Sequence, residues 1–502
     1  MSAHRDCIIS VDQSTSASKV VLFDKSGRPI HRASIKHRQY YPLPGRIEHD
    51  PLEILENVRS AIEKVLRDSE EGTTPRALAI TNQRETVVAW DRRSGRPIGR
   101  AIVWQDQRGV PICQRLRREK MDTTIAKKTG LLLDSYFSAS KLATLVREDE
   151  EAAAALRAGR LMAGTMDSWL IWNLTDRREF CIDYSNASRT MLFDINRLCW
   201  DEELLEVFGL RGVLLPETRC SDVQFGEARS PSRIQGLPIA GVMGDSHAAL
   251  FGHCGWHEGD IKATYGTGTS IMRNIGENPR PPGPGIVLSL GWGFQGRPSY
   301  VFEGNIHSTG DTISWLRDKL GLFDSYEDAE ALAAETGDNS GVYLVPAFAG
   351  LGAPYWIHNI GALITGLTRD SGRGHVIRAG LESIAYQVRD LVEAMAASAA
   401  LPGCLHADGG AIRNRFLMQF QADILGIPVL ASKVEEISAR GVALMAGMFT
   451  GMFANTDEVA ALPFETCKYI PQMDSARRQR LLKGWESAIR QALAGKSDSQ
   501  PV

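Results

Sequence analysis

The chain lacks a long apolar run, a closely spaced cysteine pair and a surplus of basic residues. Its apolar stretches fall short of the roughly 18 residues that a membrane helix needs, so we expect no transmembrane segment. The cysteines are scattered without a C-x-x-C pair, which argues against a disulfide framework or a zinc site. A net charge of -3 leaves no basic surplus for nucleic acid. With no signal-peptide pattern at residues 1–6, we expect a cytoplasmic protein.

Length and composition indicate a globular protein with more than one core. A chain of 502 residues suits two domains of about 250 residues each. Strand-like runs alternate with amphipathic helices, which indicates an α/β architecture. We place the domain boundary near residue 250, which gives domains over residues 1–250 and 251–495. Residues 496–502 are small and polar, and we expect them to form a disordered tail.

Two segments, one in each half of the chain, have the same pattern. In both, an apolar strand leads into a turn rich in Gly, Ser and Thr, and a second apolar strand follows. Asp12 opens the first turn, which contains Thr15, Ser16 and Lys19, and the second turn contains Thr267. Such turns let backbone N–H and hydroxyl groups bind phosphate oxygens. Either turn alone is explained as well by an ordinary β-hairpin, but the repetition favours a pair of phosphate clamps and phosphoryl transfer.

Three further clusters contain candidate chemistry. Polar residues 81–86 follow the buried-strand pattern of residues 77–80, at the strand end where open α/β sheets bind ligands. Asp245 follows a glycine on a turn, where its carboxylate could accept a proton from a hydroxyl, although Gly-Asp is also a common structural turn. Gly409 and Gly410 lie between a strand and a helix, where backbone can approach a flat ring or a phosphate.

Taken together, these segments resemble the FGGY family of carbohydrate kinases. The resemblance runs in order over residues 8–490 and rests on residues 12–13, 82–86, 102–105, 136–138, 185–193, 244–245, 265–268, 346–356 and 408–410. It implies two actin-like, ribonuclease H-like domains that flank a catalytic cleft and close on ATP, Mg²⁺ and a polyol. Spacing and composition alone do not indicate that fold.

The resemblance also implies a role for individual residues. Asp245 matches the catalytic base, and Asp12 with Asp245 matches the carboxylates that hold Mg²⁺ largely through water. The positions that match polyol contacts are Arg84, Glu85, Trp104, Tyr136, Asp245, Ser246 and Ser270. The positions that match the ATP site are Thr15, Ser16, Lys19, Thr267, Gly310, Ser314, Gly410 and Asn414.

Several positions depart from the pattern of family members that phosphorylate glycerol. Ser246 and Ser270 stand where those members have Gln and Phe, so we expect a larger and more polar pocket. Lys19 replaces an Arg, which keeps the charge but loses the bidentate fork. Ser314 replaces a Gln near the nucleotide. His247 follows these polar residues and is expected either to contact substrate or to pack behind the site.

These features predict an ATP-dependent kinase for a primary hydroxyl of a small polyol. Glycerol is the first expectation because Arg84, Glu85, Trp104 and Tyr136 are all present. A four- or five-carbon polyol or ketose, such as erythritol, xylitol or xylulose, is the alternative. A non-catalytic sugar-sensing protein of the same fold is a third reading, against which the intact Asp245 argues. The expected partners are the polyol and ATP, without nucleic acid or membrane, and the assembly is left open between a homodimer and a homotetramer.

Overall fold

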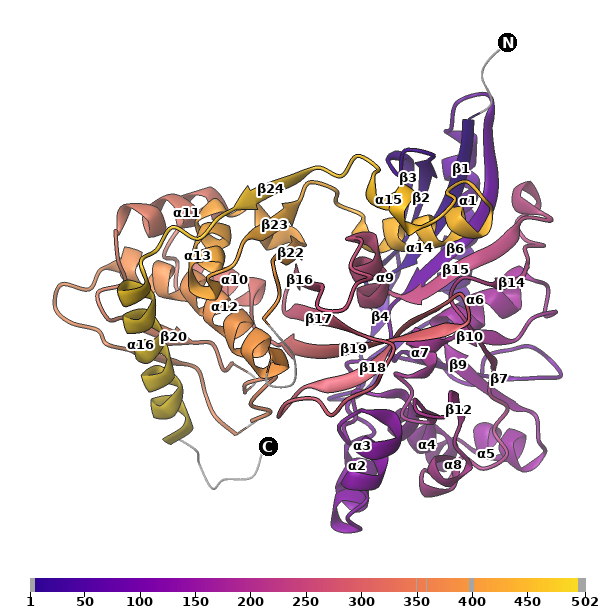
Figure 1. The fold of residues 1–502 in the computed structure, drawn as a ribbon. Helices are drawn as coiled ribbons and strands as arrows, with labels where there is room; N and C mark the ends of the chain where they lie inside the picture. The colour runs from indigo at the N-terminus through magenta and orange to yellow at the C-terminus, as the bar shows by residue number, and fades with distance from the viewer. Residues whose placement is uncertain (1–4, 349, 358, 397–400, 495–502) are drawn as a thin grey trace.

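The computed structural model describes the chain except for residues 1–4, 349, 358, 397–400 and 495–502. The described chain forms two α/β lobes side by side, one built on a six-stranded and the other on a seven-stranded sheet (Figure 1). The predicted α/β class is thus confirmed, whereas the predicted tail lies outside the described residues. The eight cysteines, all in the described part, are unpaired, as predicted.

The first sheet has the strand order β14-β15-β6-β1-β2-β3. Its strands are β1 (Arg5–Gln13), β2 (Ala17–Asp24), β3 (Pro29–Lys36), β6 (Thr73–Asn82), β14 (Gln224–Glu227) and β15 (Pro238–Gly244). The strands β1, β6 and β15 are parallel, and their register aligns Asn82 with both Gln13 and Gly244. Three carboxyl ends therefore meet at one edge, the place where open α/β sheets bind ligands.

The second sheet has the strand order β18-β19-β17-β16-β22-β23-β24. Its strands are β16 (Ile261–Tyr265), β17 (Thr269–Gly276), β18 (Val287–Phe294), β19 (Arg297–Ile306), β22 (Leu405–Asp408), β23 (Val429–Ser432) and β24 (Thr466–Tyr469). The run β19-β17-β16-β22-β23 repeats, in order and direction, the run β3-β2-β1-β6-β15 of the first sheet. The two predicted strand-turn-strand segments are confirmed as the first hairpin of each sheet.

Smaller sheets and helices surround these two sheets. A five-stranded sheet contains β4 (Gln39–Tyr40), β5 (Glu48–His49), β8 (Ala101–Ile102), β7 (Val87–Asp91) and β9 (Leu161–Thr165). Two-stranded sheets pair β10 (Cys181–Asp183) with β13 (Glu217–Arg219), β11 (Phe193–Asp194) with β12 (Cys199–Trp200), and β20 (Tyr343–Val345) with β21 (Leu363–Thr365). The first-half helices are α1 (Pro51–Arg67), α2 (Val110–Arg118), α3 (Asp122–Thr129), α4 (Ser138–Glu148), α5 (Glu150–Arg157), α6 (Met166–Leu174), α7 (Tyr184–Ala187), α8 (Glu202–Val207), η1 (Ser232–Ile234) and α9 (Asp245–Gly252). The second-half helices are α10 (Gly310–Asp318), α11 (Tyr326–Glu335), α12 (Arg373–Ala396), η2 (Gly410–Arg413), α13 (Arg415–Leu425), α14 (Ile437–Phe449), α15 (Thr456–Ala460) and α16 (Ser475–Ala494).

Helix α14 comes late in the sequence but packs against the first sheet. It contacts α9 and the strands β1, β6 and β15 (Figure 1). Its Val442 shares one buried cluster with Ile8 and Met243 of that sheet. The crossing with α9 is close because position 441 is glycine: a side chain there would place its Cβ 1.8 Å from the carbonyl oxygen of Ala248. Residues of the second half therefore complete the core of the first lobe.

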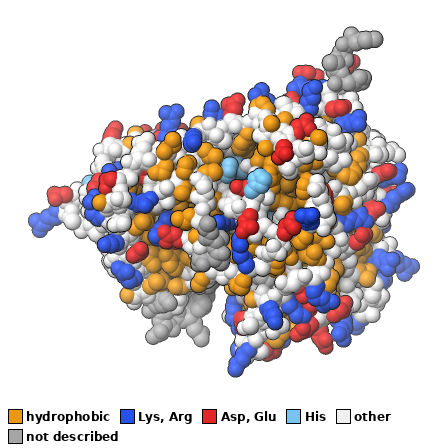
Figure 2. Space-filling view, viewed as in Figure 1, with side chains coloured by type: hydrophobic (Ala, Val, Ile, Leu, Met, Phe, Trp, Pro, Cys, Tyr) orange, Lys and Arg blue, Asp and Glu red, His pale blue; other side chains and the backbone are white. Residues whose placement is uncertain are grey.

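Basic and acidic side chains are interspersed on the face of the molecule in Figure 2. This mixture agrees with the net charge of -3. In the described part of the chain, no helix combines the length and the apolar character that crossing a membrane requires.

Candidate active site

The shared edge of β1, β6 and β15 brings together candidates from three distant segments. Asp12 lies at the end of β1, Arg84 and Glu85 follow β6, and Asp245 begins α9 directly after β15. Arg84 Nε donates a hydrogen bond to Asp245 Oδ1 at 3.0 Å. The backbone N–H of Ser246 donates to the same oxygen at 2.6 Å. The side chain of Asp245 is nevertheless 38% exposed, so its carboxylate can be reached by a substrate.

Asp12 is a buried carboxylate with both basic and acidic side chains nearby. Burial raises its pKa to about 7; Lys19 opposes this effect, and the negative charges of Glu436 and Asp245 add to it. Lys19 Nζ lies 3.1 Å from Glu436 Oε2 and 4.0 Å from Asp12 Oδ2. Lys19 therefore already has an acidic partner, Glu436, which the sequence analysis did not single out and which immediately precedes α14.

Arg84 is held by a residue from the other sheet, Glu303 of β19. The two carboxylate oxygens of Glu303 accept from Arg84 Nη1 at 2.7 Å and from Nη2 at 2.8 Å. Arg189 joins the same network: its Nε donates to Glu85 Oε1 at 2.6 Å, and its Nη1 lies 2.9 Å from Glu303 Oε2. Burial alone would raise the pKa of Glu303, but the guanidinium groups of Arg189 and Arg84 hold it well below its usual range. Glu303 thus stays charged and fixes Arg84 in place.

Sequence reasoning missed Glu303, although a signal was present. Glu303 stands inside an apolar strand pattern, between Phe302 and Gly304. A glutamate is almost never fully buried unless it is paired, and Glu303 is fully buried. An acid in a buried strand therefore indicates a buried basic partner, but the sequence does not say which.

Trp104 and Tyr136 form an aromatic wall beside these charges. Their ring centroids are 5.4 Å apart at an interplanar angle of 60°. Trp104 Nε1 donates to Thr15 Oγ1 at 3.0 Å, so the wall is tied to the first turn. Behind the wall, the buried Lys141 of α4 donates from Nζ to the carbonyl oxygens of Ser135, at 2.9 Å, and of Tyr136. Burial lowers the pKa of Lys141 to about 8. Sequence reasoning also missed Lys141.

Ser246 and Ser270 meet between the lobes. Their Oγ atoms are 3.2 Å apart, and they belong to α9 and to β17 of the second sheet. His247, in contrast, is fully buried, and its Nε2 lies 3.4 Å from Ser289 Oγ. Of the two expectations for His247, packing behind the site is therefore the correct one.

The second turn lies against the backbone segments that contain Gly310 and Gly410. Gly310 N–H donates to the carbonyl oxygen of Gly266 at 3.0 Å. Gly409 has a φ of 95°, and a side chain there would place its Cβ 2.3 Å from the carbonyl oxygen of Tyr265. Gly410 and Thr267 are exposed. Exposed backbone and a hydroxyl at one end of a sheet suit the phosphates of a nucleotide.

The remaining candidates for the nucleotide site differ in whether their side chains already form hydrogen bonds within the protein. Ser314 Oγ donates to the carbonyl oxygen of Gly310 at 3.0 Å and lies 3.0 Å from Tyr326 Oη. Asn414 caps α13, where its Oδ1 accepts from the N–H of Leu417 at 2.8 Å. Ser16 is exposed in the first turn. Of these three side chains, only Ser16 is not already used by the fold itself.

Comparisons with known proteins cover nearly the whole chain. The N-terminal domain of the FGGY family of carbohydrate kinases matches residues 7–252, and its C-terminal domain matches residues 261–449. Glycerol kinase 1 of Thermotoga maritima is 49% identical over 490 residues, which cover 97% of this chain and 99% of that protein. Glycerol kinase of Symbiobacterium thermophilum is 44% identical over 487 residues, covering 97% and 98%. The crystal structure of Plasmodium falciparum glycerol kinase with ADP has a TM-score of 0.93 at 33% identity, covering 97% of this chain and 98% of that one.

Proposed function

The chain belongs to the FGGY family of carbohydrate kinases, and we propose that it transfers the γ-phosphoryl group of ATP to a primary hydroxyl of glycerol. The observation that carries the proposal is the placement of Asp245. Its carboxylate is partly exposed at the edge shared by three parallel strands, and Arg84 holds it. Its neighbour Ser246 touches Ser270, which follows the second turn, so the second turn lies near Asp245.

Asp245 acts as the general base. Its carboxylate takes the proton of the attacking hydroxyl while the hydroxyl oxygen attacks the γ-phosphorus in line, the bond to the bridging oxygen breaks and ADP leaves. Arg84 and the N–H of Ser246 both occupy Oδ1. The proton therefore goes to Oδ2. Closure of the lobes keeps water from replacing the polyol as acceptor.

The polyol binds between the charged network and the aromatic wall. Arg84 donates to one hydroxyl and Glu85 accepts from the next, while Trp104 and Tyr136 cover the C–H groups. Glu303 and Lys141 act as positioning residues, because they hold these side chains without reaching the substrate themselves.

The phosphates bind at the two turns. Thr15, Ser16, Lys19 and Thr267 donate to phosphate oxygens, and Gly310, Ser314, Gly410 and Asn414 line the rest of the nucleotide. Lys19 exchanges part of its contact with Glu436 for a phosphate, because a charged ligand competes for the same ammonium.

Mg²⁺ fits the carboxylates Asp12 and Asp245, whose mutual repulsion adds to the raised pKa of Asp12 and would be relieved by a cation. Among the described residues, no group of three or more His, Cys, Asp and Glu side chains is placed to hold a metal. Mg²⁺ commonly takes only one or two carboxylates together with water and phosphate. When bound, the ion neutralises phosphate charge.

A four- or five-carbon polyol or ketose is a second candidate substrate, favoured by the contact between Ser246 and Ser270. Both side chains are small, and at 3.2 Å they satisfy each other. A longer polyol can replace that contact with its own hydroxyls, whereas glycerol would leave the space to water. Ser246→Gln combined with Ser270→Phe should then shift preference toward glycerol.

An ADP-release screen over polyols and ketoses of increasing length tests both candidates. If glycerol has the highest kcat/KM, the first candidate stands and the idea of an enlarged pocket is wrong. A higher kcat/KM for a longer substrate, lost in the double variant, establishes the second candidate. An absence of ADP release with every substrate contradicts both.

A further inference from the structure

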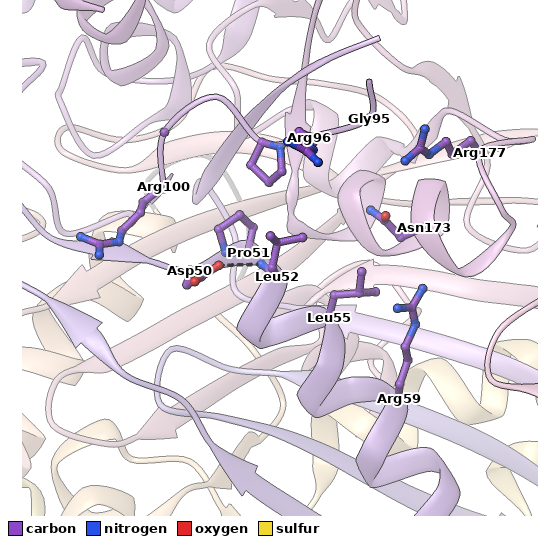
Figure 3. Close-up of a pocket in the computed structure, with 12 residues that line it drawn as sticks. Asp50, Pro51, Leu52, Leu55, Arg59, Gly95, Arg96, Arg100, Asn173 and Arg177 are labelled. Carbon is purple, nitrogen blue, oxygen red and sulfur yellow. Dashed lines mark hydrogen bonds between the residues drawn. The ribbon is translucent and has the colours of Figure 1, made fainter. Parts of the chain in front are cut away.

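We propose that the chain has a second anion site, outside the catalytic cleft, that binds a small phosphate-bearing ligand. The site is a cavity of about 750 Å³ between the start of α1, the segment that joins β7 to β8, and the end of α6 (Figure 3). None of the candidate catalytic, polyol or nucleotide residues lines it. The proposal does not depend on the kinase reaction.

The cavity wall is strongly basic in a chain of slightly negative net charge. Its lining contains Arg59, Arg96, Arg100 and Arg177 but only one acidic residue, Asp50. The charge of Asp50 is already offset, because its Oδ1 accepts from two backbone N–H groups at the start of α1. An anion that enters the cavity therefore meets an excess of positive charge.

One of the four arginines already has partners. Arg100 lies 3.7 Å from a carboxylate oxygen of Glu48, and its guanidinium stands 3.7 Å from the ring centroid of Tyr40. The other three, Arg59, Arg96 and Arg177, form no ion pair with any acid of the described residues. Arg59 Nε is also buried without a hydrogen-bond acceptor in the described chain. Buried donors are nearly always satisfied by protein or by ordered water, so this N–H is available to an acceptor in the cavity.

Arg177 lies in a turn after the end of α6, and its guanidinium forms part of the cavity wall beside Gly95. Asp176 and Arg177 both adopt left-handed conformations, with φ of 55° and 64°, which are unfavourable for residues other than glycine. The guanidinium lies against Gly95, where a side chain would place its Cβ only 2.3 Å from Arg177 Cζ. In Figure 3, the side chains of Arg59 and Arg177 both point toward the part of the cavity beside Asn173. Arg177 is exposed, so its guanidinium is accessible to a ligand, and it has no acidic partner in the described chain.

The donor set identifies the class of ligand. Guanidinium groups bind phosphate in a bidentate manner, with two parallel N–H···O bonds each. Three of them around a cavity of this size suit a multiply charged phosphate compound better than a single carboxylate. The ligand is either free phosphate or pyrophosphate, or a phosphorylated metabolite that presents the same group.

Equilibrium dialysis of the full chain tests the site, with inorganic phosphate, pyrophosphate and glycerol 3-phosphate as probes. Arg59→Gln combined with Arg177→Gln should bind one equivalent less than the unmodified protein, or bind that equivalent at least tenfold more weakly. The matched control, Arg233→Gln with Arg369→Gln, removes the same charge from exposed positions elsewhere and should bind as the unmodified protein does. Stronger binding of the organic probe identifies a metabolite, and equal or stronger binding of the inorganic probes identifies free phosphate.

A second measurement uses only the unmodified protein, so it does not depend on how the variants fold. Phenylglyoxal modifies accessible arginines, and mass spectrometry locates the adducts. The bound probe should slow modification of Arg59 and Arg177 severalfold while Arg233 reacts as before. Equal binding by the two double variants, or modification of Arg59 and Arg177 that no probe slows, overturns the proposal.

Discussion

Asp245 is the single side chain on which the proposed chemistry depends most. Asp245→Asn keeps the shape and the acceptor for Arg84 but cannot take a proton. We expect it to retain polyol and ATP binding and to lower kcat by roughly 10²–10⁴-fold, the range for loss of a general base. Steady-state ADP release and a binding titration measure the two properties separately. Turnover close to normal would remove Asp245 from the mechanism.

The residues that we propose to contact ligands stand in patterns that the sequence shows, but those that hold them in place do not. Arg84, Glu85 and Asp245 stand in recognisable turns after strands, and the structure brings Arg84 and Asp245 within 3.0 Å. Glu303 lies 219 residues from Arg84 in the chain, and no local pattern links the two. Such a contact follows from the sheet order of both lobes, which propensity and spacing do not determine.

The first turn, which contains Thr15, has a contact with the aromatic wall that the second turn, which contains Thr267, is not expected to share. Thr267 is an exposed residue, whereas Thr15 Oγ1 accepts a hydrogen bond from Trp104 Nε1. Thr267→Val should therefore raise only the KM for ATP, by about 2- to 10-fold for one lost hydrogen bond. Thr15→Val should raise the KM for both ATP and polyol, because the aromatic wall loses an anchor. If Thr267→Val instead affected the polyol alone, the turns would not be a pair of phosphate clamps.

Helix α6 contains a carboxyl group that should make stability depend on pH. Burial raises the pKa of Asp167 to about 7, and Asp183 adds to this. In the unfolded chain the pKa is about 3.9. The folded state therefore holds a proton that the unfolded state releases, and stability falls as pH rises from about 4 to about 7.

The variant Asp167→Asn should not lose stability between about pH 4 and about pH 7 in this way, because its side-chain amide is neutral at every pH in that range. Above pH 7 the variant should have a higher Tm than the unmodified protein, and the difference should shrink toward pH 4. Thermal unfolding at a series of pH values measures both profiles. Parallel profiles would mean that Asp167 does not titrate in this range.

Among the larger elements, the hairpins and the α/β alternation could be predicted because short-range hydrophobic patterns encode them. The packing of α14 could not be predicted, because the pattern of its apolar residues does not show which lobe the helix packs against. Its position depends on Gly441, whose missing side chain allows the approach to α9, and such a requirement becomes visible only with both helices in place.

Glu303 connects the two lobes through a buried charge. Glu303→Gln keeps its shape but leaves the guanidinium groups of Arg84 and Arg189 without their shared carboxylate. Loss of one partner of a buried ion pair typically costs about 3–5 kcal/mol, so we expect a loss of that size in the free energy of unfolding. The KM for polyol should also rise, because Arg84 is no longer held. Denaturant unfolding and polyol kinetics measure the two effects.

The matched control is Glu435→Gln, which breaks exposed pairs with Arg32 and Arg413. Each exposed pair is worth at most about 1 kcal/mol, and both lie outside the proposed polyol site. If the two variants had the same free energy of unfolding and the same KM for polyol, Glu303 would have no special role.

The packing of α14 on the first sheet has a consequence for biosynthesis. A ribosome releases residues 1–250 long before it has made Ile437–Phe449. Until then the face formed by β1, β6 and β15 lacks the helix that covers it in the finished protein. The first lobe therefore cannot complete its core in the usual order from N-terminus to C-terminus, and its apolar face stays uncovered until translation is nearly complete.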